Sequence, residues 1–533
     1  MSAEDAGAPA APASGRFAAL VALGILVSRI AGLVRERAFA HYFGNSGIAD
    51  AVKAAFRIPN LLQNLFGEGV LSASFIPVYA RLLAEGDTAG ARRVAGAIGA
   101  ALTFAISVVV LAGVVATPWL IDFLAPGFEG ERRALTIVLV RVLFPGVGLL
   151  VLSAWCLGIL NSHRRFFLAY AAPVIWNAAI IGAMLIYGRD QSPADLAVSV
   201  AWGAVVGSAA QLAIQLPRTL RLAGRMPFRI DRGSTGVRTV FRNFAPAFLG
   251  RGVLQVSAYL DQLLASLLPL GAVAALGYAQ ILYTLPVSLF GMSISAAELP
   301  LLSSALGNER EIAAAMRVRL ETAMRRVAYF IVPSAVAFVA LGDVVTAVIY
   351  RTGRFGADDV RYVWGILAAS AVGLLATTLA RLFSAAYYAL RDTRTPLRFA
   401  CVRLAVGVGL GVPLAFAAPR PLGLDPRWGA AGLALASGIA GWVELALLRR
   451  ALEPRIGRTR LPDGLLSRLW TVAIASAAVA LIVERFSGAA HPAVAAIAVL
   501  GSFGGVYLVT TFALGIGEAR TTVSRLAARL RRA

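Results

Sequence analysis

Arginine residues recur inside long apolar stretches of this sequence, where a charge is costly to bury. Arg29 and Arg35 lie in the segment 28–36, and Arg57 lies in the following apolar segment. A charge in the middle of a bilayer costs several kcal/mol unless it faces water or a partner. The planar guanidinium donates two parallel hydrogen bonds to an anion, and a phosphate group accepts them in that geometry. These three arginines therefore predict an anion site, with phosphate as its natural ligand.

Three acidic residues, Glu36, Asp50 and Glu68, accompany the arginines. They are expected either to neutralise the arginines as ion pairs within the membrane, or to orient them toward an anion and gate closure. The residues expected to interrupt the two apolar helices here are Gly32, Pro59, Gly67 and Gly69. Helices broken at membrane depth are tolerated only where they line a cavity or are packed in protein. The pattern thus predicts a cavity beside the charged residues.

The amino-acid composition predicts which kind of secondary structure positions these charged residues. The chain has 533 residues, of which 59% are hydrophobic and 15% charged, with a mean hydropathy of +0.75. Soluble domains have about 45–50% apolar and about 25% charged residues, so we predict an all-α polytopic membrane protein. Fourteen transmembrane helices are expected, at residues 17–40, 49–80, 94–118, 134–160, 168–187, 194–216, 240–268, 272–305, 323–349, 362–390, 396–417, 428–448, 465–484 and 492–515.

The net charge of +22 is distributed unevenly between the predicted loops. Loops on the side of the N-terminus hold 32 of the 50 basic residues, whereas loops on the opposite side hold 9. Cytoplasmic loops are enriched in Lys and Arg, so both termini are predicted to be cytoplasmic. The same rule accounts for most of the positive charge, and nucleic acid is not expected as a partner.

A weak internal repeat predicts two halves. Pro59 recurs as Pro286 and Gly148 as Gly373, at offsets of 227 and 225 residues. Two pseudo-symmetric six-helix lobes with a central site are typical of a secondary transporter. The predicted organisation is a disordered tail (1–16), an N-terminal lobe (17–216), a basic linker (217–239), a C-terminal lobe (240–448), a second linker (449–464), two extra helices (465–515) and a basic tail (516–533).

The sequence offers little for enzyme or metal chemistry. Cys156 and Cys401 both lie in apolar runs, and the three histidines are scattered, so neither a disulfide framework nor a metal site is expected. There is no nucleotide-binding fingerprint, which argues against ATP as the energy source. We therefore expect a transporter with no cofactor and no catalytic residues.

Three segments resemble the MurJ (MviN) family of lipid II flippases, which belongs to the multidrug/oligosaccharidyl-lipid/polysaccharide exporter superfamily. Residues 28–36 read SRIAGLVRE, residues 50–87 begin DAVKAAFRIPNLL, and residues 388–396 read YALRDTRTP. The resemblance implies a fold of six, six and two helices in the bacterial plasma membrane. It implies that an inward-open cavity lined by spans 1, 2, 7 and 8 captures an undecaprenyl-pyrophosphate-linked peptidoglycan precursor.

The resemblance also implies roles for parts of the chain. The precursor would move from the inner to the outer leaflet by alternating access, with its tail in a groove formed by the last helix pair. The family's functional positions that match are Arg29, Arg35, Asp50 and Glu68. Membrane lipids and proteins of cell-wall synthesis are the other expected partners.

The chain departs from the family pattern at two cationic positions. Gln63-Asn64 follows the segment NLL, where the family usually has arginine, and Ile281 occupies the place of an arginine in span eight. Arg251, on span seven, is expected either to supply the lost charge or to extend toward the membrane surface. If it compensates, Arg251→Ala should inactivate the protein, and adding Ile281→Arg should restore transport.

A second departure concerns the driving force. Asp261 matches an acid that contributes to a sodium site in some family members, but its expected partners on span eleven are Gly407 and Gly411. Asp261 is therefore a candidate for a sodium site, a proton site or a structural contact. Sodium ions, protons or the membrane potential are all open as driving forces.

Two other transport functions and one inactive role are alternatives. The two departures from the family pattern, at Gln63 and Ile281, lie at positions expected to bind the head group of the substrate. The substrate is therefore either lipid II or another polyprenyl-pyrophosphate-linked glycan. A drug/cation antiporter of the same superfamily requires an acid-rich cavity, whereas this one is rich in arginine. The third alternative is an inactive scaffold that retains the fold.

Overall fold

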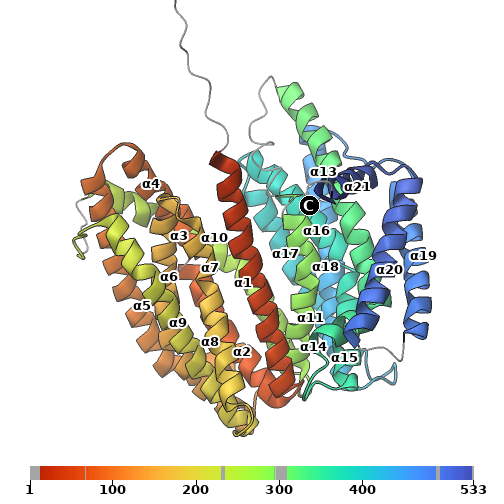
Figure 1. The fold of residues 1–533 in the computed structure, drawn as a ribbon, viewed down its shortest axis with the longest axis horizontal. Coiled ribbons are helices and arrows are strands. Elements are labelled where there is room, and N and C mark those ends of the chain that lie inside the picture. The colour runs from red at the N-terminus through yellow and green to blue at the C-terminus, as the bar shows by residue number, and fades with distance from the viewer. Residues whose placement is uncertain are drawn as a thin grey trace, which may run out of the picture. The chain divides into compact units, whose positions relative to one another are not determined.

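A computed structural model describes residues 13–66, 68–229, 234–292, 294–295, 309–487 and 492–530. Every regular element in these ranges is a helix (Figure 1). The chain forms two compact units. Unit 1 comprises residues 1–43 and 47–259, and unit 2 comprises residues 44–46 and 260–533.

Unit 1 is a helical bundle around α6. Its helices are α1 (Ala13–Phe43), α2 (Gly47–Phe66), α3 (Glu68–Ser74), α4 (Ile76–Ala84), α5 (Thr88–Leu124), α6 (Gly130–Ser162), α7 (Phe166–Ala171), α8 (Pro173–Tyr187), α9 (Pro193–Ala223) and most of α10 (Thr235–Ser266). Helix α6 packs against α2, α5 and α9, and α8 packs against α1 and α9. Since α6 has helices on several sides, most of its second half is buried.

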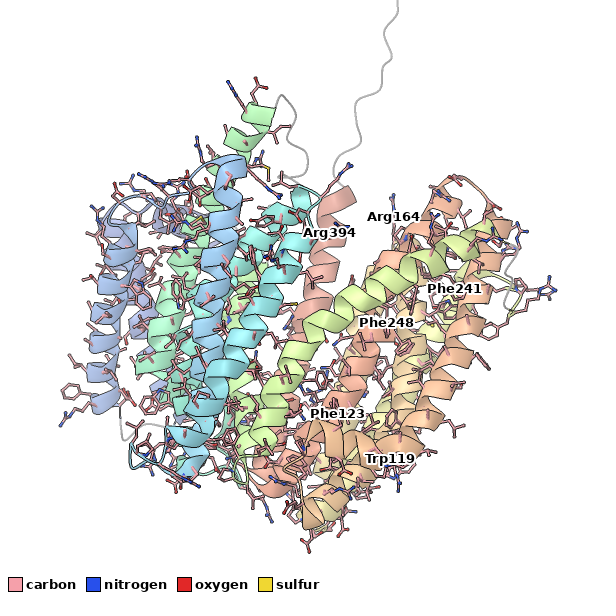
Figure 2. All side chains as sticks on the ribbon, turned by 180° about the vertical axis from the view of Figure 1, so that it is seen from behind. Trp119, Phe123, Arg164, Phe241, Phe248 and Arg394 are labelled. Carbon is pink, nitrogen blue, oxygen red and sulfur yellow. The ribbon has the colours of Figure 1, made fainter. Side chains whose placement is uncertain are left out.

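The exterior of unit 1 is apolar, as expected for contact with lipid. Trp119 and Phe123, near the end of α5, are 69% and 72% exposed. Figure 2 shows them at one end of unit 1, with Arg164 at the opposite end. Aromatic rings at helix ends are typical of membrane–water interfaces, and arginines are enriched on the cytoplasmic side.

The second predicted span, 49–80, comprises α2, α3 and α4, and the predicted interruption at Gly67 lies outside the described residues. Two of the interruptions expected from the sequence were wrong, since α1 continues through Gly32 and α2 continues through Pro59. Glycine in a helix interior costs only about 1 kcal/mol, which tertiary packing can offset. Neighbouring groups can likewise accommodate a proline in a transmembrane helix.

Unit 2 is a second bundle, in which α18 is central. Its elements after α10 are α11 (Ala272–Pro286), the π-helix η1 (Val287–Met292), α13 (Glu309–Ala340), α14 (Gly342–Tyr350), α15 (Ala357–Ala371), α16 (Leu374–Ala389), α17 (Arg394–Val412), the π-helix η2 (Pro413–Ala417), the 3-10 helix η3 (Pro426–Trp428), α18 (Gly429–Ile456), α19 (Leu465–Phe486), α20 (Pro492–Ala513) and α21 (Gly517–Leu530). Helix α18 packs against α15, α16 and α17, while α19 and α20 pack against each other.

Ten helices of the described residues are long and apolar enough to cross a membrane, or eleven with the bent pair α15 and α16. The prediction of an all-α polytopic membrane fold is confirmed. The number of fourteen spans and the boundaries of the predicted lobes, linkers and tails stay predictions. Parts of the expected tails, of the linker 217–239 and of the span 272–305 lie outside the described residues.

The last motif of the resemblance, at 388–396, runs from the end of α16 through a short loop into the first turn of α17. The Asp392 carboxylate accepts hydrogen bonds from the backbone amides of Arg394 and Thr395, at 3.1 and 3.0 Å, and forms an ion pair with Arg455 at 2.9 Å. The hydrogen bonds from Thr395 are the main reason that the pKa of Asp392 is lowered. The motif thus supplies acceptors for helical amides that have no partner within the helix.

A close helix crossing joins α16 and α18 inside unit 2. A Cβ atom added at Gly373, directly before α16, would lie 2.4 Å from the Cα atom of Gly438 on α18. Because the backbone fixes the position of the added Cβ, and the Gly438 Cα is itself a backbone atom, no side-chain rotation relieves that overlap.

We expect Gly373→Ala to destabilise unit 2 by roughly 1–3 kcal/mol, the usual cost of overpacking. Thermal unfolding of the purified protein in detergent measures the change in Tm. Gly505→Ala on α20 is the matched control, since no atom lies within 4 Å of its added Cβ. Equal Tm values for the two variants would contradict the prediction.

Candidate functional site

The charged residues of α1 and α2 meet in a buried cluster within unit 1. Arg35 Nη2 lies 2.8 Å from Glu36 Oε1, and Lys53 Nζ hydrogen-bonds to Glu36 Oε2. The side chains of Arg35, Glu36 and Lys53 are only 19%, 7% and 15% exposed. Two cations therefore share one carboxylate, and the three side chains together carry a net positive charge.

Helix α8 fixes the Arg35 guanidinium from another side. Arg35 Nη1 donates to Asn177 Oδ1 at 3.0 Å, and the Asn177 amide is itself anchored to the Pro173 carbonyl at 3.0 Å. The guanidinium also lies 5.0 Å from the centroid of the Trp176 ring. A cation held over an aromatic face in this way is stabilised and oriented.

Two donors in this cluster are unsatisfied. Arg35 Nε and Trp176 Nε1 are both buried, and neither has a hydrogen-bond partner among the described residues. Buried N–H groups without an acceptor are rare and costly, so such groups at a cationic site are candidates for ligand contacts. A net positive cluster with two free donors has the chemistry of an anion site.

Asp50 forms a second ion pair in unit 1. Its side chain is fully buried in the first turn of α2, and Arg132 Nη1 on α6 lies 3.3 Å from its Oδ2. Arg132 also donates to the Gly127 carbonyl and lies 4.2 Å from the centroid of the Phe128 ring. The partner of Asp50 in this pair is thus Arg132, in the first turn of α6, rather than one of the predicted substrate-binding arginines.

The other predicted arginines of unit 1 occupy different surroundings. Arg29 is exposed on α1. Arg57 is half-buried on α2, with its guanidinium 5.4 Å from the Tyr259 ring centroid, and the Tyr259 hydroxyl donates to the Arg57 carbonyl at 2.8 Å. The side chains of Glu68 and Arg251 lie outside the described residues, so their predicted roles stay predictions.

The structure also locates the residues at the two departures from the family pattern and at the candidate ion site. Gln63 on α2 and Ile281 on α11 are half-buried, and so is Asp261 near the end of α10. Gly407 and Gly411 lie on α17 and contribute no side-chain ligand. The described residues contain no group of three or more His, Cys, Asp or Glu side chains that could hold a metal ion.

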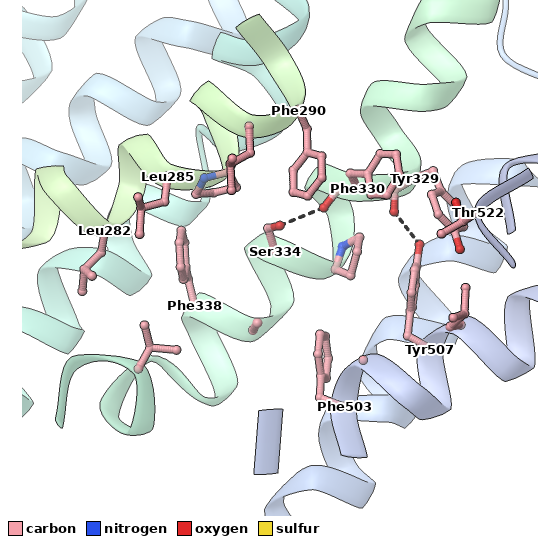
Figure 3. Close-up of a pocket in the computed structure, with 17 residues that line it drawn as sticks. Leu282, Leu285, Phe290, Tyr329, Phe330, Ser334, Phe338, Phe503, Tyr507 and Thr522 are labelled. Carbon is pink, nitrogen blue, oxygen red and sulfur yellow. Dashed lines mark hydrogen bonds between the residues drawn. The ribbon is translucent and has the colours of Figure 1, made fainter. Parts of the chain in front are cut away.

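Unit 2 contains an apolar cavity of about 430 Å³ between α11, η1, α13, α20 and α21 (Figure 3). Leu282, Phe290, Phe330 and Phe503 are among its lining residues. The Tyr507 hydroxyl donates to the Tyr329 carbonyl at 2.7 Å, so its hydrogen is not presented to the cavity. Such a lining suits a hydrocarbon chain, and α20 belongs to the helix pair that was expected to form a tail groove.

Sequence reasoning missed three members of the Arg35 cluster. Asn177 and Trp176 are neutral residues in an apolar run, more than 140 positions from Arg35 in the chain, and no local pattern links them to it. Lys53 carried a usable signal, because it is the only lysine of the chain and lies within an apolar segment.

Comparisons with known proteins agree on one family. The sequence model described as "Lipid II flippase MurJ" matches residues 39–521. A "Probable lipid II flippase MurJ" of Rhizobium tropici is 31% identical over 431 residues, which cover 79% of this chain and 78% of that protein. The "Lipid II flippase MurJ" of Burkholderia cenocepacia is 31% identical over 439 residues, which cover 81% and 82% of the two chains.

Solved structures show the same fold. "Lipid II flippase MurJ, inward closed conformation" aligns with a TM-score of 0.75 at 23% identity, covering 93% of this chain and 98% of that chain. An inward-facing multidrug resistance MATE family transporter of the MOP superfamily aligns with a TM-score of 0.66 at 16% identity, covering 82% and 98%. At these identities the likeness shows the fold alone.

Proposed function

Because the chain belongs to the lipid II flippase MurJ family, we propose that it moves lipid II from the inner to the outer leaflet of the bacterial plasma membrane for cell-wall synthesis. Members of this family are membrane transporters, and the many apolar helices fit a multi-pass transporter. The observation that carries the proposal is the buried, net positive Arg35 cluster with its two unsatisfied donors, which suits a pyrophosphate.

We assign the parts of the substrate to different parts of the chain. Arg35 and Arg29 bind the pyrophosphate, with Arg57 as a further cation, and Glu36 orients Arg35. The polyprenyl tail enters the apolar cavity beside α20. The transport cycle is one of alternating access, in which no covalent chemistry takes place and no ATP is consumed.

The membrane potential is the driving force that we favour for this cycle. Moving one charge across the membrane is worth about 2.3 kcal/mol per 100 mV, and an interior-negative potential favours outward movement of an anionic head group. Gly407 and Gly411 on α17 have no side-chain ligand for a sodium ion, so the sodium site considered at Asp261 lacks the two side chains that the family resemblance leads us to expect.

The function is tested by replacing the lipid II flippase of a bacterium with this protein. Growth after depletion of the resident flippase, together with lipid II movement in vesicles that contain the purified protein, is the expected result. A protein that inserts normally but neither supports growth nor moves lipid II would refute the proposal.

A second candidate is transport of a different polyprenyl-pyrophosphate-linked glycan. The argument in its favour is that Gln63 and Ile281 occupy positions at which the family resemblance leads us to expect arginines. Movement of another polyprenyl-pyrophosphate glycan, but not of lipid II, in the same vesicles would favour this candidate.

The orientation of the chain gives a further prediction. We propose that both termini and the segment 217–239 face the cytoplasm, because the loops of that side hold most of the basic residues. A cysteine introduced as Gly233→Cys, in a background with Cys156 and Cys401 replaced by alanine, should react with a membrane-impermeant thiol reagent only after the cells are opened. Labelling of intact cells would contradict this orientation.

A further inference from the structure

Lys53 is the only lysine in a chain with 49 arginines, and it lies in the buried cluster of unit 1. Its ammonium group contacts Glu36 Oε2, whereas Arg35 contacts the other oxygen, Oε1. The two cations therefore occupy separate oxygens of one carboxylate. Either contact can be broken while the other is kept.

From this arrangement we propose that Lys53 is a positioning residue for head-group binding. When a phosphate of the substrate approaches, Arg35 exchanges Glu36 Oε1 for a phosphate oxygen, while Lys53 keeps the Glu36 carboxylate at Oε2. This inference rests on the proposed function, which supplies the pyrophosphate, and assigns to Lys53 a role that the family comparison does not give.

The reason for the role is the cost of an isolated buried carboxylate. Removing one partner from a buried ion pair is strongly destabilising because the other charge is left uncompensated. Without Lys53, Arg35 could bind phosphate only by leaving the 7%-exposed Glu36 without that cation. The carboxylate would then compete with the substrate for Arg35.

The surrounding charges are consistent with this exchange. The nearby buried carboxylate of Asp50 is engaged by Arg132, 3.3 Å away, so Arg35, Lys53 and Arg132 provide three cations for two carboxylates. An ammonium group is compact and has three donors on a flexible stem, so it can follow the carboxylate when Arg35 turns away.

The test compares Lys53→Met with Lys53→Met/Glu36→Gln in vesicles that contain lipid II. We expect Lys53→Met to raise the KM for lipid II at least tenfold with a smaller change in kcat, because the competing carboxylate opposes binding. The double variant should recover most of that loss, since the amide carries no charge, and Lys53→Arg should retain most of the binding. An unchanged KM in Lys53→Met, or no recovery in the double variant, would overturn the proposal.

A second measurement uses the wild-type chain and does not depend on transport. An amine-reactive ester modifies only Lys53 and the N-terminal amine, and peptide mass spectrometry separates the two products. With undecaprenyl pyrophosphate bound, Lys53 should remain as protected as in the free protein, whereas it should be labelled in Glu36→Gln. Labelling of wild-type Lys53 on addition of undecaprenyl pyrophosphate would show that the carboxylate stays with Arg35, which contradicts the exchange.

The two proposals can fail separately. If wild-type vesicles move no lipid II, the proposed function fails, and binding of undecaprenyl pyrophosphate to the same variants still tests the exchange. If wild-type vesicles move lipid II, but Lys53→Met leaves the KM unchanged or the double variant shows no recovery, only the proposed role of Lys53 fails.

Discussion

Replacing Arg35 with alanine is expected to abolish lipid II transport while the protein still inserts into the membrane. The variant removes a guanidinium that is held by Glu36, Asn177 and the Trp176 ring, and with it the unsatisfied Nε donor. A hydrogen bond to a charged group is worth about 1.5–3 kcal/mol, so loss of two such contacts to pyrophosphate weakens binding by more than roughly a hundredfold.

The energy of a charge-assisted contact also predicts the effects of Arg29→Ala and of the conservative variant Arg35→Lys. Arg29→Ala should lower transport by roughly ten- to a hundredfold, the value of one charge-assisted contact. Arg35→Lys should restore activity only in part, because a point charge cannot reproduce two parallel donors. Initial rates of lipid II movement in vesicles are the measurement. Arg133→Ala, in an exposed pair with Asp122, is the control, and wild-type rates in both alanine variants of the site would remove Arg29 and Arg35 from it.

The largest effect on stability is expected from Asp50→Ala. Asp50 is fully buried, and the side chain of its partner Arg132 is only 13% exposed, so the variant leaves a guanidinium in a site that excludes water. Breaking a buried pair on one side typically costs about 3–5 kcal/mol. Thermal unfolding in detergent should therefore show a clearly lower Tm, with transport lost as a consequence.

Removing both charges distinguishes a structural pair from a site contact. Asp50→Leu/Arg132→Leu should recover most of the lost Tm, because replacing a whole buried pair with apolar residues is often neutral or stabilising. Asp122→Ala provides the matched control, since its partner Arg133 is adjacent to Arg132 but exposed, and its Tm should change little. A double variant as unstable as Asp50→Ala would contradict this account.

The positions of many helices could be predicted from the sequence alone. The apolar runs at 134–160 and 194–216 are α6 and α9, because an apolar run of this length can satisfy its backbone in lipid only as a helix. The apolar run 362–390 was predicted as a single span, but the 47° bend that divides it into α15 and α16 could not be predicted. The close approach of Gly373 to Gly438 lies at that bend, and it joins residues far apart in the chain.

The candidate site was predictable in its charges but not in its pairings. Arg35, Glu36 and Asp50 were identified by residue type and by their place in apolar runs. Which carboxylate meets which cation depends on how helices pack: Glu36 contacts Lys53, 17 positions away, and Asp50 contacts Arg132, 82 positions away. Charge alone therefore indicates the chemistry of the site, whereas the contacts of Arg35 and Lys53 with separate oxygens of Glu36 became visible only in the structure.

The apolar cavity of unit 2 has a consequence for how long a substrate remains bound. A prenyl chain that enters it leaves lipid that is as apolar as the Leu and Phe side chains around it, so the move provides little hydrophobic free energy. The tail therefore contributes little to residence time. If the Arg35 cluster binds the pyrophosphate as proposed, we expect the phosphate contacts rather than the tail to set the rate of dissociation, so that weakening them after transport would release the product.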